Sequence, residues 1–129
     1  MNKLLKKLAR AIKKLVGKAL APYYAMKDYL RYLRAVQLAD NANAHDQDRY
    51  YVMPSMDNKL LVMDRKNFRI LKHKGYIAKN ATMQNAIDEC FYYTPRLGAE
   101  GMSEQVRIQK YSEYKQWCKA MRLLKHYTK

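Results

Sequence analysis

The sequence predicts a mainly helical α+β domain that contains one β-hairpin. Apolar residues recur at helical spacing over most of the chain, and 49% of its 129 residues are hydrophobic. The middle of the chain is the only place where two short runs of aromatic and β-branched residues flank a turn-forming segment. A chain of this length forms one domain and buries roughly two-thirds of its unfolded surface. These three observations favour a single small domain preceded by a helical arm.

The first twenty residues have the pattern of a two-sided helix. At about 100° per residue, the leucines and the isoleucine fall on one half of the cylinder and the lysines and arginine on the other. No acidic residue occurs before Asp28. Such a helix needs something to lie against, which is its own domain, a partner protein, a membrane surface or a nucleic acid. We expect its leucines to dock on another subunit or on the following helix. The expected apolar anchors are Leu5, Leu8, Ile12 and Leu15.

Pro22 marks the expected boundary between this arm and the domain. Proline disrupts a helix interior and restricts the residue before it, so the first helix is expected to end between Gly17 and Ala21. Residues 1–21 then form a basic amphipathic arm, and residues 22–129 form the α+β domain. Because proline suits the first turn of a helix, a second long helix is expected to begin at Pro22 and to end near Asn43.

The middle of the chain predicts the hairpin and a first short helix. Residues 50–53 and 59–63 are strand-like, and a turn of about five residues joins them. A lone hairpin is marginal in water, so it should pack on helices. Asp64 is the expected N-cap of the next helix, and Gly75 fits the position after its end.

Two further helices are expected in the last third of the chain. Thr82 should cap a short helix whose apolar residues keep helical spacing until it fades near Tyr93. A loop with two glycines follows it. Ser103 should cap the last helix, which is expected to reach about Tyr127.

The net charge of +15 predicts an anionic partner, which is a nucleic acid, an anionic membrane or an acidic protein face. The charge is segregated, because residues 1–34, 64–80 and 105–129 are strongly basic and the segments between them are mildly acidic. This pattern favours basic patches over a uniform coat. The side chains expected to contact an anion or a nucleic acid are Lys6, Arg10, Lys13, Lys14, Arg31, Arg34, Arg65, Lys66, Arg69 and Lys72.

The sequence carries no pattern typical of catalysis. Cys90 and Cys118 form no metal or redox motif, and we expect both to be buried thiols in a reducing compartment. The three histidines are isolated from other metal ligands. A glycine-rich phosphate loop and a nucleophile elbow are both missing from the sequence. We therefore expect no enzymatic activity, no metal, no cofactor and no small-molecule substrate.

Two other modes of binding remain open. Residues 64–93 have helices of the length found in a helix-turn-helix, but their seven-residue connection is too long and the second helix lacks lysine and arginine. Sequence-independent phosphate contact is therefore favoured over base reading. The first helix also has the leucine and lysine layout of peptides that lie on membranes, although it lacks tryptophan and phenylalanine. No apolar run is long enough to predict a membrane span.

Four runs in the middle of the chain carry a resemblance to a known group of proteins. They are RYYVMP (49–54), KLLVMDRKNFR (59–69), GYI (75–77) and ECFYYTP (89–95). With these runs, residues 49–95 resemble small proteins encoded by crAss-like and related phages of gut Bacteroidales. The resemblance implies a phage-encoded, virion-associated protein, and it carries no functional residue with it.

Together, these features predict a non-enzymatic structural or accessory component of a phage particle, in its capsid or its tail and portal assembly. Its expected partners are other virion or assembly proteins, with DNA phosphates as a further partner. Its expected location is the virion, or the host cytoplasm during assembly. A sequence-independent nucleic-acid-binding accessory protein and a membrane-surface-binding protein are the alternatives.

Overall fold

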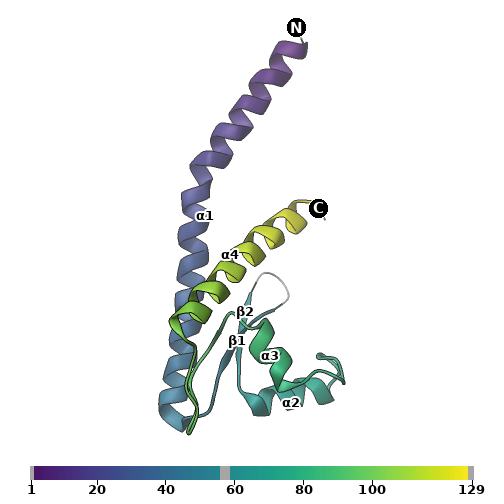
Figure 1. The fold of residues 1–129 in the computed structure, drawn as a ribbon. Helices are drawn as coiled ribbons and strands as arrows, with labels where there is room; N and C mark the ends of the chain where they lie inside the picture. Colours follow the sequence, from purple (N-terminus) through teal and green to yellow (C-terminus); the bar gives the residue numbers. More distant parts are fainter. Residues whose placement is uncertain (1, 56–58, 128–129) are drawn as a thin grey trace. The chain divides into compact units, whose positions relative to one another are not determined.

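The computed structural model describes residues 2–55 and 59–127, and the side chains of residues 3–14, 20–55 and 59–125. The elements follow the order α1 (Asn2–Asp46), β1 (Tyr51–Pro54), β2 (Leu60–Met63), α2 (Arg65–His73), α3 (Met83–Glu89), β3 (Tyr92–Tyr93) and α4 (Glu104–Tyr127) (Figure 1). The predicted fold class, α+β and mainly α, is confirmed. The chain divides into two compact units, Met1–Arg31 and Tyr32–Lys129, which are described separately.

The two helices expected before residue 46 are one continuous helix, so the predicted break at Pro22 is wrong. Proline removes one backbone hydrogen bond and crowds the preceding turn, at a cost of about 3 kcal/mol. The segments on both sides of Pro22 contain many leucines and alanines, whose helix propensities oppose that local cost. Residues 1–21 therefore do not dock on the following helix, because both segments belong to α1. The division between the units also lies at Arg31, beyond the expected boundary at residue 21.

The second unit is built on a three-stranded antiparallel sheet of order β2-β1-β3. The predicted hairpin is confirmed, with Tyr51 opposite Met63 and Val52 opposite Val62. The third strand was not predicted, because Tyr92 and the residue after it were expected at the end of a helix. Helix α3 ends earlier because Cys90 is already extended, and the following strand pairs with β1.

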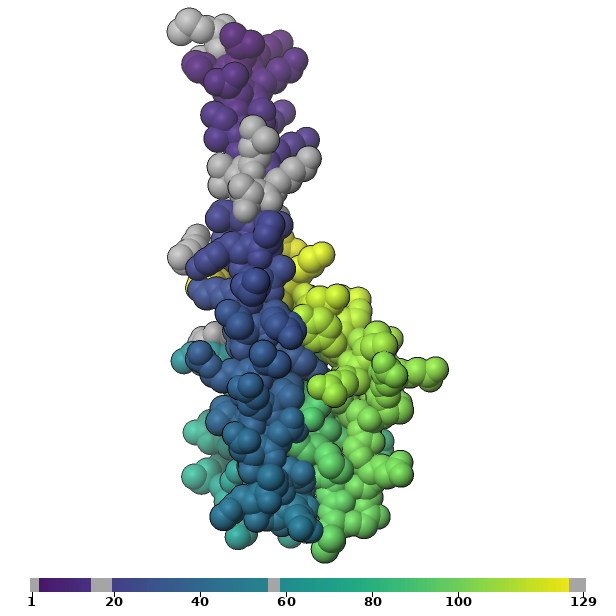
Figure 2. Space-filling view, turned by 90° about the vertical axis from the view of Figure 1, so that its left-hand side faces the viewer, coloured from purple at the N-terminus to yellow at the C-terminus, as the bar shows by residue number. Residues whose placement is uncertain are grey.

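The sheet separates two clusters of buried side chains. One face carries Val52 and Tyr92, which pack against Val36 of α1 and Tyr114 of α4. The other face carries Tyr51 and Met63, which pack with buried residues of α2 and α3. Within residues 32–127, the end of α1 and helix α4 thus cover one face, while α2 and α3 cover the other (Figure 1). Figure 2 shows the green surface of the segment that leads into α4 beside the last turns of α1.

The predicted helix starts are confirmed by their capping contacts. The carboxylate of Asp64 accepts a hydrogen bond from the Asn67 amide at 2.8 Å. Thr82 and Asn85 form a reciprocal capping box at the start of α3. The Ser103 hydroxyl accepts from the amide of Val106 at 3.3 Å. These local contacts set where α2, α3 and α4 begin.

Lys110 of α4 is buried and ties that helix to the end of α3. Its ammonium group donates to the carbonyl of Ile87 at 2.6 Å and to that of Cys90 at 2.9 Å. These carbonyls belong to the last residues of α3 and its C-cap, where intrahelical partners are missing. The buried lysine therefore donates hydrogen bonds to backbone carbonyls at the end of a neighbouring helix, which have no partner within that helix. Cys90 and Cys118 are buried thiols, as predicted.

We expect stability to fall as the pH rises from 10 to 12. Burial raises the pKa of Tyr32 from 10.0 to about 12. Burial, and then the hydrogen bond of its hydroxyl to Asp40 at 2.6 Å, also raise the pKa of Tyr92. Because both pKa values are raised on folding, the stabilisation is complete below pH 10 and is lost as the phenols ionise. The urea concentration at the midpoint of unfolding, measured across this pH range, tests the prediction.

The control for this prediction is Tyr32→Phe, which removes one of the two phenols. Its urea midpoint should fall less steeply between pH 10 and pH 12 than that of the parent chain. A midpoint that stays constant over the same range in the parent chain would contradict the assigned pKa shifts.

Candidate functional site

The first unit presents an exposed row of apolar side chains along α1. Leu5, Leu8 and Ile12 are 57%, 58% and 54% exposed. They are three of the four predicted anchors, and the side chain of the fourth, Leu15, lies outside the described residues. Large apolar side chains exposed together on one side of a helix mark an interaction surface.

The same row continues in the second half of this unit. Tyr23, Met26 and Leu30 are also exposed. Each follows one of the three anchors by 18 residues, which is five helical turns, so the two sets lie on the same side of α1. The spacing of three and then four residues in each set is that of a coiled-coil seam. We call this set the apolar stripe, which consists of Leu5, Leu8, Ile12, Tyr23, Met26 and Leu30.

The side of this unit opposite the first half of the stripe is basic. The predicted anion-contacting residues Lys6, Arg10, Lys13 and Lys14 are all exposed. Arg31 differs from them, because its guanidinium lies 3.9 Å from the carboxylate of Asp28. Arg34, which belongs to the second unit, is exposed. The first half of the helix that carries the stripe is therefore strongly positive, with no carboxylate before residue 28.

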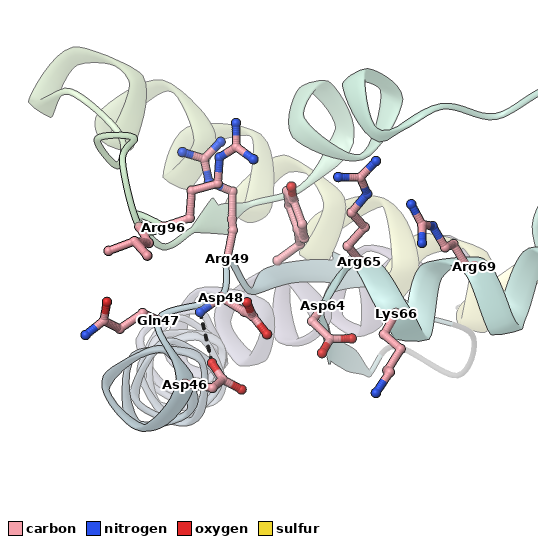
Figure 3. A pocket seen from close by; sticks show the side chains of 11 residues that line it. Asp46, Gln47, Asp48, Arg49, Asp64, Arg65, Lys66, Arg69 and Arg96 are labelled. Carbon is pink, nitrogen blue, oxygen red and sulfur yellow. Dashed lines mark hydrogen bonds between the residues drawn. The ribbon is translucent and has the colours of Figure 1, made fainter.

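The second unit contains a pocket of about 530 Å³ with a basic lining. Arg65, Lys66 and Arg69 were predicted to contact an anion, and all three line it from the start of α2. Arg49, which precedes β1, and Arg96, which follows β3, add two further basic side chains to the lining (Figure 3). Lys72 was predicted to join them, but its ammonium group instead donates to the carbonyl of Ala81 at 2.6 Å.

No local sequence signal pointed to Arg49 and Arg96, because both lie in mildly acidic segments. They reach α2 through the tertiary fold. The amide of Leu97 donates to the carbonyl of Gln47, and the amide side chain of Asn43 donates to the carbonyl of Pro95. These bonds join the loop after β3 to the end of α1.

Comparison of the chain with protein-family models, with curated proteins and with solved structures found no match to any of them. Among the described helices, none is both long enough and apolar enough to cross a membrane.

Proposed function

We propose that the protein is a non-enzymatic structural or accessory component of a phage particle. It acts in the capsid or in the tail and portal assembly, where the N-terminal part of α1 binds neighbouring subunits. The observation that carries this proposal is the apolar stripe, six exposed side chains on one side of a single helix. The resemblance of residues 49–95 to small phage proteins supports the particle as its location.

The charge of the first unit favours an acidic partner over a second copy of the same chain. A symmetric pair of these helices would bring together two lysine-rich segments that have no carboxylate before residue 28, so their net positive charges would repel each other. An acidic protein face with an apolar groove complements both features of the helix. The apolar contacts supply affinity, and the lysines steer the encounter.

A second candidate function is sequence-independent nucleic-acid binding. The specific observation that favours it is the cluster of four arginines and one lysine around the pocket of the second unit. Phosphate contacts of this kind position a protein on nucleic acid without reading its sequence. Binding to a membrane surface through the apolar stripe is the third alternative.

The dependence of binding on salt concentration distinguishes binding to particle subunits from binding to nucleic acid. Particles of a phage that encodes the chain are purified and washed with NaCl raised from about 0.1 M to about 1 M, and the bound chain is quantified. We expect the chain to stay bound, because apolar contacts are not screened, whereas phosphate-led binding falls steeply over this range. Release in the middle of the range would support the nucleic-acid function instead. A chain that is missing from particles but floats with anionic vesicles would support the membrane.

A further inference from the structure

We propose that the basic pocket of the second unit is a binding site for a phosphate group. We call it the arginine pocket, defined by Arg49, Arg65, Arg69 and Arg96. The site is built entirely from residues 46–97, and it does not depend on the function proposed for α1.

The positive charge of the pocket is not neutralised, because four arginines and one lysine line it against three carboxylates. Three carboxylates also line it, those of Asp46, Asp48 and Asp64. Among the side chains of residues 3–14, 20–55 and 59–125, the single ion pair within 4.0 Å is the one between Arg31 and Asp28, outside the pocket. The arginines of the pocket therefore lie near carboxylates without pairing with them.

Two of these carboxylates are engaged by their own segments. Asp46 accepts hydrogen bonds from the hydroxyl of Tyr50 at 2.5 Å and from the amide of Asp48 at 3.0 Å. The bond from Tyr50 is the main reason that the pKa of Asp46 is lowered, so this group stays ionised where it is held. Asp64 caps α2. In Figure 3, the guanidinium groups of Arg49, Arg65 and Arg96 point to one side, and the carboxylates of Asp46 and Asp64 lie on the other.

Contacts within the chain hold Arg49 in place before any ligand binds. Arg49 donates from Nε to the carbonyl of Thr94 at 2.9 Å and from Nη2 to that of Glu100 at 2.7 Å. Its guanidinium also lies 4.9 Å from the ring centre of Tyr93. A charged group held in this way loses little conformational entropy when an anion binds.

The pKa of a buried tyrosine responds to the positive electrostatic potential in the arginine pocket. Tyr51 lines the pocket and is only 5% exposed. Burial raises its pKa, and the charges of Arg49 and Arg96 oppose that rise. Both guanidinium groups therefore act on one phenol at the wall of the pocket, where an anion would meet the same field.

The number of arginines in the pocket favours a phosphate group over a carboxylate as its ligand. One guanidinium fork satisfies the two oxygens of a carboxylate, whereas a phosphate offers further oxygens to a second and a third fork. Because Arg65 and Arg96 reach the pocket from different segments, they can approach a tetrahedral group from different directions. The source of the group is free phosphate, a terminal phosphomonoester or the phosphodiester backbone of a nucleic acid.

The test is a calorimetric titration of the full chain with three probes at constant ionic strength. They are inorganic phosphate, a short oligothymidylate and the same oligothymidylate with a 5′-phosphate. We expect Arg65→Gln and Arg96→Gln each to weaken binding of the preferred probe by about tenfold or more, since each removes charge-assisted hydrogen bonds. Both side chains are exposed, so both variants should keep the unfolding temperature of the parent chain.

Lys74→Gln is the matched control, because it removes one charge at the other end of α2, outside the pocket. It should change binding by less than about twofold. Equal weakening by this control would overturn the site in favour of general attraction, and so would the lack of saturable binding by all three probes. Tighter binding of the 5′-phosphorylated probe identifies a phosphomonoester. Equal binding of both oligothymidylates identifies the backbone, and binding of inorganic phosphate alone identifies the free anion.

Discussion

Replacing both Leu8 and Ile12 with glutamate is expected to weaken attachment of the chain to particles by about a hundredfold or more. Each side chain supplies roughly 1.5–3 kcal/mol when fully buried, and a charged replacement in an apolar groove adds a desolvation cost. Glutamate is a good helix former, so α1 should persist in the variant. The measurement is the fraction of chain that co-sediments with particles at increasing chain concentration.

The matched control for this pair is Lys6→Gln with Lys13→Gln. It makes the same change in net charge on the opposite side of α1. This control should weaken attachment by only about threefold, through the loss of partly screened charges. If the two double variants weaken attachment equally, charge rather than the apolar stripe holds the chain, and the proposed role of Leu8 and Ile12 fails.

Replacing Tyr114 with alanine is expected to lower the free energy of unfolding by about 3–5 kcal/mol. Tyr114 is fully buried in the cluster between the sheet, α1 and α4. Its ring centre lies 5.0 Å from that of Tyr32, 5.4 Å from that of Phe91 and 6.1 Å from that of Trp117. Such a loss is a large part of the roughly 5–15 kcal/mol typical of a domain. Urea unfolding followed by tryptophan fluorescence gives the value.

Tyr114→Phe serves as the control for the aromatic cluster. It keeps the ring and removes only the hydroxyl, so it should cost less than about 1.5 kcal/mol. A Tyr114→Ala variant that lost less than about 1 kcal/mol would show that this cluster is not the main core of the second unit.

Local sequence signals predicted the helix starts and the hairpin, which are stabilised by contacts between residues close together in the sequence. Asp64, Thr82 and Ser103 each cap the helix that they were expected to cap, and the two predicted strands pair as a hairpin, whose predicted turn falls in part on residues 56–58, outside the described residues. Pro22 is the exception, because its local cost is smaller than the summed helix propensity of the long segments around it. Pro22 alone therefore led to the wrong prediction of two helices in the first 46 residues.

Non-local features were not predictable in the same way. Strand β3 exists because the amide of Phe91 donates to the carbonyl of Val52 and the amide of Thr94 donates to that of Tyr50. The arginine pocket likewise joins Arg49 and Arg96, which are 47 positions apart in the chain, to the start of α2. The charge pattern identified the α2 arginines alone, since the other two lie among acidic residues. Pairings over such distances leave little trace in local periodicity.

Hydrogen exchange over residues 4–14 tests most directly whether the apolar stripe is covered by a partner. Exchange of these amides is followed by mass spectrometry in purified chain and in intact particles at the same pH. Covering the stripe should stabilise these helical turns and slow their exchange in particles by about a hundredfold. Equal exchange in the two samples, with the chain present in both, would contradict the claim that α1 binds through its apolar side.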